Sequence, residues 1–165
     1  PYSIADLLGD DELVERYRDG VFVTLRLKPS CYHRVRAPCA GGMERVIYIS
    51  GDTWNVNPIA LKRVEELFCK NERAVLDLQL PEAGQHVAVV AVAAILVASI
   101  KLHCLGPSLD LRYRGPNRIA CEATFEKGDE LGYFQHGSTL IVFASEGYSL
   151  CDHLTDVHLK VRVRL

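Results

Sequence analysis

Hydrophobic and polar residues alternate along several stretches of this chain. Over 21–27 the odd positions carry Val or Leu and the even positions carry Phe, Thr or Arg, and Pro29 follows. The segments 43–49 and 74–80 are also strand-like, and the tail 158–165 alternates strictly between polar and apolar residues. A period of two is typical of a strand with one buried and one solvated face. We therefore predict β-strands at these four segments.

An apolar run that is rich in valine covers residues 87–100, and Ser99 is its one polar residue. A helix needs about 20 apolar residues to cross a membrane, and this run is shorter. Valine favours strands because its branched side chain packs well on a pleated surface. The run therefore predicts buried central strands, two of them joined near Ala93 and Ala94.

Helical signals are fewer. Ser3 can cap a short helix through Leu8, and a second helix over 10–19 is stopped by Gly20. A third helix is predicted over 57–70, because Asn57 supplies a cap and a proline follows in the first turn. The apolar stripe of this third helix, which we expect to pack on the core, is Leu61, Val64, Leu67 and Phe68.

Many short strands with few helices predict an α+β fold that is mainly β, with a barrel-like or sandwiched sheet core and short flanking helices. The chain has 165 residues, of which 48% are hydrophobic and 24% charged. That size and composition suffice for one hydrophobic core. We therefore predict a single domain over 1–165.

Charge and cysteine content exclude some classes of function. The formal net charge of -2 gives no basic field, so we expect no nucleic-acid partner. The six cysteines are irregularly spaced, which favours reduced thiols over a disulfide framework. No pair of cysteines or histidines has the spacing of a zinc site, so we predict no metal.

The sequence Gly137-Ser138-Thr139 precedes the apolar run 140–143. Taken alone, this tripeptide is more typical of a turn before a strand. The same residues also suit self-cleavage, in which the serine hydroxyl attacks the preceding carbonyl to form an ester. Elimination then cuts the chain and leaves dehydroalanine, which water hydrolyses to a pyruvoyl group. Glycine before the serine removes a Cβ that would obstruct the strained geometry. A base must take the hydroxyl proton.

A series of collinear segments favours self-cleavage over the turn, because their order resembles that of the phosphatidylserine decarboxylase family. The resemblance covers nearly the whole chain, which makes it more specific than any one motif. The segments that carry it are 2–4, 22–24, 27–29, 32–35, 51–58, 67–73, 92–100 and 127–139.

The resemblance implies a covalent pyruvoyl cofactor made from Ser138. Gly137 would donate the attacked carbonyl, and Thr139 would act as a local hydrogen-bonding group. The resemblance further implies that His33 donates or accepts a proton near the substrate carboxylate during decarboxylation. The implied reaction converts phosphatidylserine to phosphatidylethanolamine in phospholipid biosynthesis.

Position 36 departs from the family's pattern, because Arg36 replaces a histidine that serves as the base for self-cleavage. Arginine stays protonated and accepts no hydrogen bond, so it cannot take that role. Three alternatives therefore stay open. They are a member that keeps the fold and binds lipid without turnover, a decarboxylase of a soluble amino acid, and a carrier module that uses Lys127.

A lipid substrate implies a cytoplasmic protein that contacts a membrane peripherally. Two alternatives stay open for the apolar start of the chain, which contains Leu7, Leu8, Leu13, Val14 and Tyr17: it contacts the bilayer, or it packs on the domain itself, which is the more common case. A homodimer is one alternative for the oligomeric state. Residue 1 is Pro rather than Met, so we expect a segment upstream of it.

Overall fold

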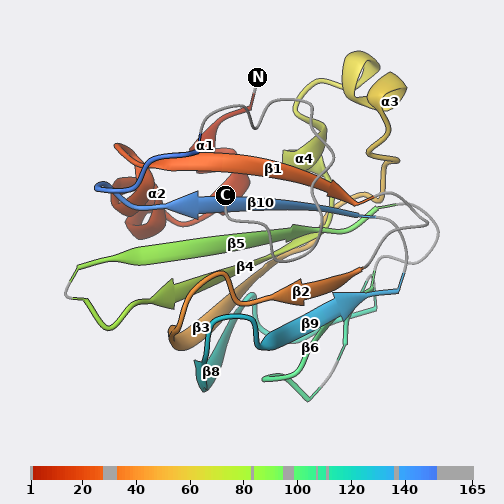
Figure 1. The fold of residues 1–165 in the computed structure, drawn as a ribbon. Coiled ribbons are helices and arrows are strands. Elements are labelled where there is room, and N and C mark those ends of the chain that lie inside the picture. Colours follow the sequence, from red (N-terminus) through yellow and green to blue (C-terminus); the bar gives the residue numbers. More distant parts are fainter. Residues whose placement is uncertain are drawn as a thin grey trace.

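The computed structural model describes residues 2–27, 33–82, 84–94, 99–106, 108–110, 112–135 and 138–151. Short helices and antiparallel sheets make up this part of the chain (Figure 1). The helices are α1 (Ile4–Leu8), α2 (Asp11–Tyr17), α3 (Pro58–Arg63) and α4 (Leu67–Lys70). The strands are β1 (Val21–Leu27), β2 (Arg34–Arg36), β3 (Gly41–Ile49), β4 (Arg73–Gln79), β5 (His86–Val92), β6 (Ser99–Leu102), β7 (Leu109–Asp110), β8 (Arg118–Phe125), β9 (Glu130–Phe134) and β10 (Ser138–Ala144).

The strands form a larger sheet of order β1-β10-β5-β4-β3-β8 and a smaller sheet of order β2-β9-β6-β7. The smaller sheet covers one face of the larger sheet, and α1, α2 and α4 cover the other face (Figure 1). This arrangement confirms the predicted α+β, mainly β class. The core is sandwiched between open sheets and is not a closed barrel.

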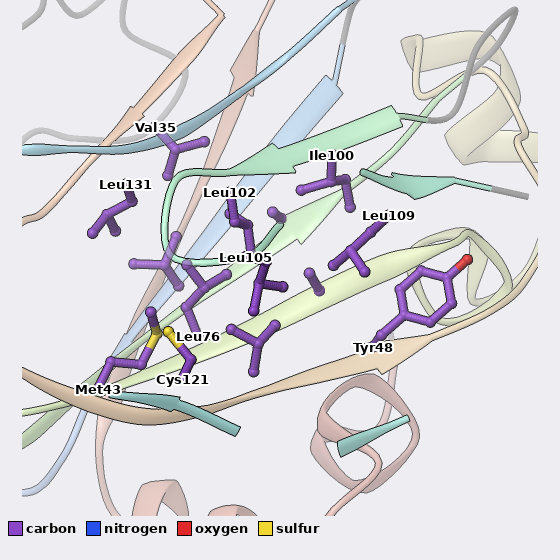
Figure 2. Close-up of a cluster of buried hydrophobic side chains, with 14 of the residues drawn as sticks. Val35, Met43, Tyr48, Leu76, Ile100, Leu102, Leu105, Leu109, Cys121 and Leu131 are labelled. Carbon is purple, nitrogen blue, oxygen red and sulfur yellow. The ribbon is translucent and has the colours of Figure 1, made fainter. Parts of the chain in front are cut away.

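Two hydrophobic cores lie on opposite faces of the larger sheet. The inter-sheet core, part of which Figure 2 shows, includes Val35, Met43, Tyr48, Leu76, Leu78, Ala91, Ala93, Ile100, Leu102, Leu131 and Leu140. The helix-side core includes Leu7, Leu8, Leu13, Tyr17, Phe68, Val75, Val90, Val92, Ile141 and Phe143. Side chains alternate between the two cores along each central strand, since successive residues of a strand point to opposite faces.

This layering explains the apolar run 87–100. Strand β5 is buried on both faces, so it needs apolar residues at successive positions. The run continues in β6, which belongs to the smaller sheet. The predicted pair of buried strands is therefore confirmed, with β5 ending at Val92, just before Ala93 and Ala94.

The alternation over 21–27 is also confirmed. In β1 the odd positions are half-buried and the even positions are exposed. The whole strand pairs with β10, from Val21 opposite Ala144 to Leu27 opposite Ser138. The strands predicted at 43–49 and 74–80 correspond to β3 and β4. The predicted strand 158–165 lies outside the described residues.

The prediction of one helix over 57–70 is wrong. Asn57 caps α3 as expected, but that helix ends at Arg63 and buries none of its residues. Val64 is extended, and Glu66 adopts a left-handed conformation with φ of 53°, so α4 starts as a separate helix. Leu61 is exposed as a result. Within α3, Ala60 alone packs against the helix-side core, and it is only partly buried, so this short helix has little to extend it.

The two N-terminal helices begin where predicted. Ser3 caps α1 through its hydroxyl, and Asp10 caps α2 by accepting hydrogen bonds from the amides of Glu12 and Leu13. The second helix ends at Tyr17, before the predicted stop at Gly20.

Of the two alternatives for the apolar chain start, packing on the domain is the one that the structure shows. Leu7, Leu8, Leu13 and Tyr17 are all buried in the helix-side core, and Val14 is half-buried. They contact the larger sheet of the domain, so they cannot contact a bilayer in this fold. Among the described helices, none has the length and apolarity to cross a membrane.

Candidate active site at the start of strand β10

Ser138 is the first residue of β10 and is fully buried. Its side chain lies on the inter-sheet face, because Leu140, two residues farther along the strand, belongs to the inter-sheet core. The Ser138 hydroxyl has no hydrogen-bond partner among the described residues. Buried hydroxyls are normally paired, so an unpaired one indicates a site with a further role.

The register of the larger sheet places Glu72 and Ser138 at matching positions on neighbouring chain segments, with Ala93 between them; we call these three residues a row. Val92 of β5 faces Thr139 of β10 on one side and Arg73 of β4 on the other. One residue beyond these, Ser138 and Glu72 flank Ala93, whose amide donates to the Glu72 carbonyl at 2.9 Å.

The side chains of this row share one face of the sheet. Ala93, Ala74 and Leu140 all belong to the inter-sheet core. Glu72 lies two residues before Ala74, and Ser138 lies two residues before Leu140, so both point to that face.

His33 lies at the same end of the molecule, immediately before β2. Its carbonyl accepts a hydrogen bond from the amide of Phe134 at 2.9 Å, which places it at the end of β9. The end of β9 therefore lies beside the start of β2, and β10 begins at Ser138, four residues after Phe134 (Figure 1). The Nε2 atom of His33 is buried and has no partner among the described residues.

Unpaired buried polar atoms gather at this end. Within the described residues, five of the six side chains with such atoms lie at this end: His33, Glu72, Ser99, Ser138 and Thr139. The exception is His86, whose Nδ1 lies 3.5 Å from Asp77. A concentration of unpaired polar atoms is expected where a protein performs chemistry rather than only packs.

Thr139 occupies the other face of the sheet. Its neighbours along the strand on that face, Ile141 and Phe143, belong to the helix-side core. Its hydroxyl is buried and has no partner among the described residues, so its role as a local hydrogen-bonding group stays a prediction. Gly137, which the sequence places at the attacked carbonyl, lies outside the described residues.

Glu72 is fully buried and is held by Tyr48. The Tyr48 hydroxyl donates to Glu72 Oε1 at 2.6 Å and lies 3.0 Å from the carbonyl oxygen of Asp110. Burial raises the pKa of Glu72 from its ordinary value of 4.5 to about 7, although the hydrogen bond from Tyr48 opposes this rise. Burial also raises the pKa of Tyr48, so this hydroxyl stays protonated. Figure 2 shows Tyr48 at one end of the inter-sheet core.

The residues on either side of Glu72 have structural tasks. The Asn71 side chain donates to the carbonyls of Trp54 and Ala93 at 2.8 and 2.9 Å, and it accepts from the Trp54 amide at 2.8 Å. The Arg73 guanidinium donates to backbone carbonyls at the ends of α1 and α4, namely those of Asp6, Leu7, Cys69 and Asn71. These bonds fix the segments that surround the row.

Arg36 lies away from Ser138. It is exposed on the outer face of the smaller sheet, where its guanidinium donates to the Gly128 carbonyl at 3.1 Å and lies 3.6 Å from Glu130. Arg34 and His103 also contact Glu130. The side chain at position 36 therefore belongs to a surface ion-pair cluster.

Sequence reasoning found Ser138 and His33 but missed Glu72 and Ser99. A signal for Glu72 was present, because two charged residues, Glu72 and Arg73, precede the apolar stretch 74–76 of a central strand. Its meaning required the register between β4, β5 and β10, which no local pattern supplies. In the described part of the chain, no group of three or more His, Cys, Asp or Glu side chains could hold a metal ion.

Comparison with known proteins places this site in a family. The sequence profile described as phosphatidylserine decarboxylase matches residues 1–164. Similar proteins named phosphatidylserine decarboxylase proenzyme include that of Vibrio cholerae, 40% identical over 163 residues, which cover 93% of this chain and 56% of the relative. Those of Marinobacter nauticus and Haemophilus influenzae are each 38% identical, over 88% and 93% of this chain and 52% and 54% of the relative.

The chain thus spans about half the length of the curated relatives that it matches. The profile match extends over both sheets and over every residue of the candidate site. The chain belongs to the phosphatidylserine decarboxylase family.

Proposed function

We propose that this chain forms the catalytic part of a phosphatidylserine decarboxylase, which converts phosphatidylserine to phosphatidylethanolamine with a pyruvoyl group made from Ser138. The observation that carries the proposal is the buried Ser138 at the start of β10, with an unpaired hydroxyl, in a chain whose relatives are named proenzymes. A proenzyme must be converted to become active, and self-cleavage before Ser138 is such a conversion.

The residues around Ser138 fit this group. A pyruvoyl group supplies a carbonyl that condenses with the substrate amine and takes up the electrons released as carbon dioxide leaves. The hydroxyl from which it would form is already buried, which excludes water from the reacting atoms. The residues 139–144 pair with both β1 and β5, so the short fragment would remain in the sheet after a cut at 137/138.

His33 is the proposed proton donor or acceptor for the substrate carboxylate. The support for this role is its place at the end of the smaller sheet that leads to Ser138, with a buried and unpaired Nε2 atom. Imidazole is suited to the task, because its ordinary pKa lies close to neutral pH.

Peripheral membrane contact is proposed through α3 in place of the chain start. Trp54, Ile59 and Leu61 are exposed by 48%, 63% and 37%, and Lys62 and Arg63 follow in the last turn of α3. Apolar side chains beside basic ones suit a bilayer that contains anionic lipid. Asn71 connects this surface to the site, because it binds both Trp54 and Ala93. A cytoplasmic location stays a prediction.

Two of the alternatives have no specific support. Lys127 is exposed in the turn between β8 and β9, but these strands belong to different sheets, so the turn does not form the hairpin tip of a carrier module. A decarboxylase of a soluble amino acid would have no use for the apolar surface at α3. Both alternatives make the opposite prediction in the substrate assay below.

The decisive experiment measures maturation and turnover together. The freshly expressed chain is incubated with phosphatidylserine vesicles, with free serine or with free tryptophan, and products are measured by mass spectrometry. We expect phosphatidylethanolamine from the vesicles only. We also expect denatured protein to separate into residues 1–137 and a short fragment 138–165 with a blocked amino terminus. An intact 18.4 kDa chain without product would contradict the proposal. Ser138→Ala is the control that must stay intact.

A further inference from the structure

Glu72 has one carboxylate oxygen that the fold does not use. Tyr48 binds Oε1, while Oε2 is buried without a partner among the described residues. The side chains of Asn71 and Arg73, by contrast, make several hydrogen bonds each. A buried carboxylate oxygen left unpaired is costly, so its retention indicates a task beyond packing.

The position of Glu72 defines that task. Neighbouring strands lie about 4.8 Å apart, so the backbones at Glu72 and Ser138 are separated by two such spacings, about 10 Å. Ala93, whose side chain is a methyl group, lies between them in this row, and its side chain is on the inter-sheet face. Tyr48, which holds Glu72 Oε1, lies on β3, on the side of β4 away from β10, so a water molecule on the shared face of the sheet would link the Glu72 carboxylate to the Ser138 hydroxyl.

Self-cleavage requires a base at Ser138 that the sequence pattern did not supply. Arg36 cannot accept a proton and lies on the outer face of the smaller sheet. Resting on the proposed function, we infer that Glu72 is the base that takes the Ser138 hydroxyl proton during self-cleavage, with Tyr48 as the residue that positions its carboxylate.

The proton leaves Ser138 Oγ for Glu72 Oε2, Oγ bonds to the carbonyl carbon of Gly137, and the peptide C–N bond breaks with protonation of the Ser138 nitrogen. Loss of the Ser138 α-proton then breaks the ester C–O bond and leaves a carboxylate on Gly137. One water converts the resulting dehydroalanine into the pyruvoyl group and ammonia.

The surroundings of Glu72 suit a base that works near neutral pH. Its pKa of about 7 leaves a large ionised fraction at neutral pH while keeping it strong enough to accept a proton. The groups that influence it are Tyr48 on β3, whose hydrogen bond lowers the pKa, and Asp110 on β7, whose charge raises it. Arg114 acts on Tyr48, and the His33 side chain lies at this end of the smaller sheet.

The test follows maturation of the freshly translated full chain over time, as cleaved fragments on denaturing gels. We expect Glu72→Gln to slow cleavage by about 100-fold or more, the usual contribution of a general base. Glutamine keeps the acceptor for Tyr48 but cannot take a proton. The matched control is Glu122→Gln, an exposed glutamate of β8, which should cleave at the normal rate.

A second variant separates chemistry from structure. The normal chain should cleave more slowly as pH falls below about 7, with the midpoint at the pKa of Glu72. Tyr48→Phe removes the hydrogen bond that lowers this pKa, so its midpoint should move to higher pH, which a purely structural role of Tyr48 would not produce.

The outcomes are distinct. Glu72→Gln that cleaves at the normal rate, or with the normal pH profile, overturns the role of Glu72 while leaving the proposed function intact. A normal chain that never cleaves and makes no phosphatidylethanolamine overturns the proposed function itself.

Discussion

The buried Glu72 predicts an unusual dependence of stability on pH. The perturbation is Glu72→Gln, made in a Ser138→Ala background so that every chain remains uncut. A carboxylic acid whose pKa is raised by folding holds more protons in the folded state than in the unfolded state. Between the unfolded value of 4.5 and the folded value of about 7, stability therefore falls as pH rises.

The size of the effect follows from the shift. One pKa unit corresponds to about 1.4 kcal/mol, so the full shift of Glu72 sets an upper limit of about 3 kcal/mol. We expect about 2 kcal/mol, because even buried sites respond as if the local dielectric were higher than that of a dry interior. The glutamine variant lacks this penalty. It should match the parent near pH 4.5 and exceed it in stability by about 2 kcal/mol above pH 7.

Urea unfolding followed by tryptophan fluorescence at a series of pH values measures this difference. Comparing the two proteins at each pH cancels every other titrating group that they share. The exposed Glu122→Gln serves again as the control and should show no gain at high pH. A constant difference across the pH range, or a parent that gains stability over the variant as pH rises, would refute the reasoning about Glu72.

Three further predictions concern other parts of the structure. Arg73→Leu should lower the free energy of unfolding by about 3–5 kcal/mol in urea titrations, because it leaves buried backbone carbonyls unpaired, whereas the exposed Arg26→Leu should change it by less than about 1 kcal/mol. Ile59→Asp should weaken sedimentation with anionic vesicles by about tenfold, while Leu150→Asp, near the opposite end of β10, should not. Asp10→Asn should keep the cap of α2 but lose the ion pair with Arg118. Burial raises the pKa of Asp10, but hydrogen bonds and the charge of Arg118 outweigh burial and lower this pKa. The variant should therefore be less stable than the parent protein above the folded pKa of Asp10 and equally stable in acid, which thermal unfolding at several pH values measures.

Local patterns predicted the strands whose burial follows a regular pattern along the chain. The alternation in 21–27 places one face of β1 against the core, and the unbroken run 87–92 reflects a strand buried on both faces. The helix over 57–70 failed for a related reason. The stripe through Leu61 predicted packing, but the chain turns at Val64 and Glu66, so Leu61 faces solvent.

The candidate site was predictable only in part. The resemblance implied catalytic roles for Ser138 and His33, so the sequence identified them, whereas it implied none for Glu72, although the segment 67–73 also carries the resemblance. Glu72 is distant from Ser138 along the chain, and the two share a row only because β5 lies between β4 and β10. Whether a polar residue faces a reaction centre or a carbonyl depends on that register, which long-range pairing determines.

The pairing of β1 with β10 also sets an order of events during biosynthesis. The first strand of the chain pairs with the last described strand, so this contact closes a loop of more than a hundred residues. Such long-range contacts form late and slowly, since the chain must lose much conformational entropy first. The row of Ser138 and Glu72 exists only once β10 has docked between β1 and β5. If the chain cuts itself as proposed, the cut would therefore follow folding, and the two fragments would already be paired in the sheet when they separate.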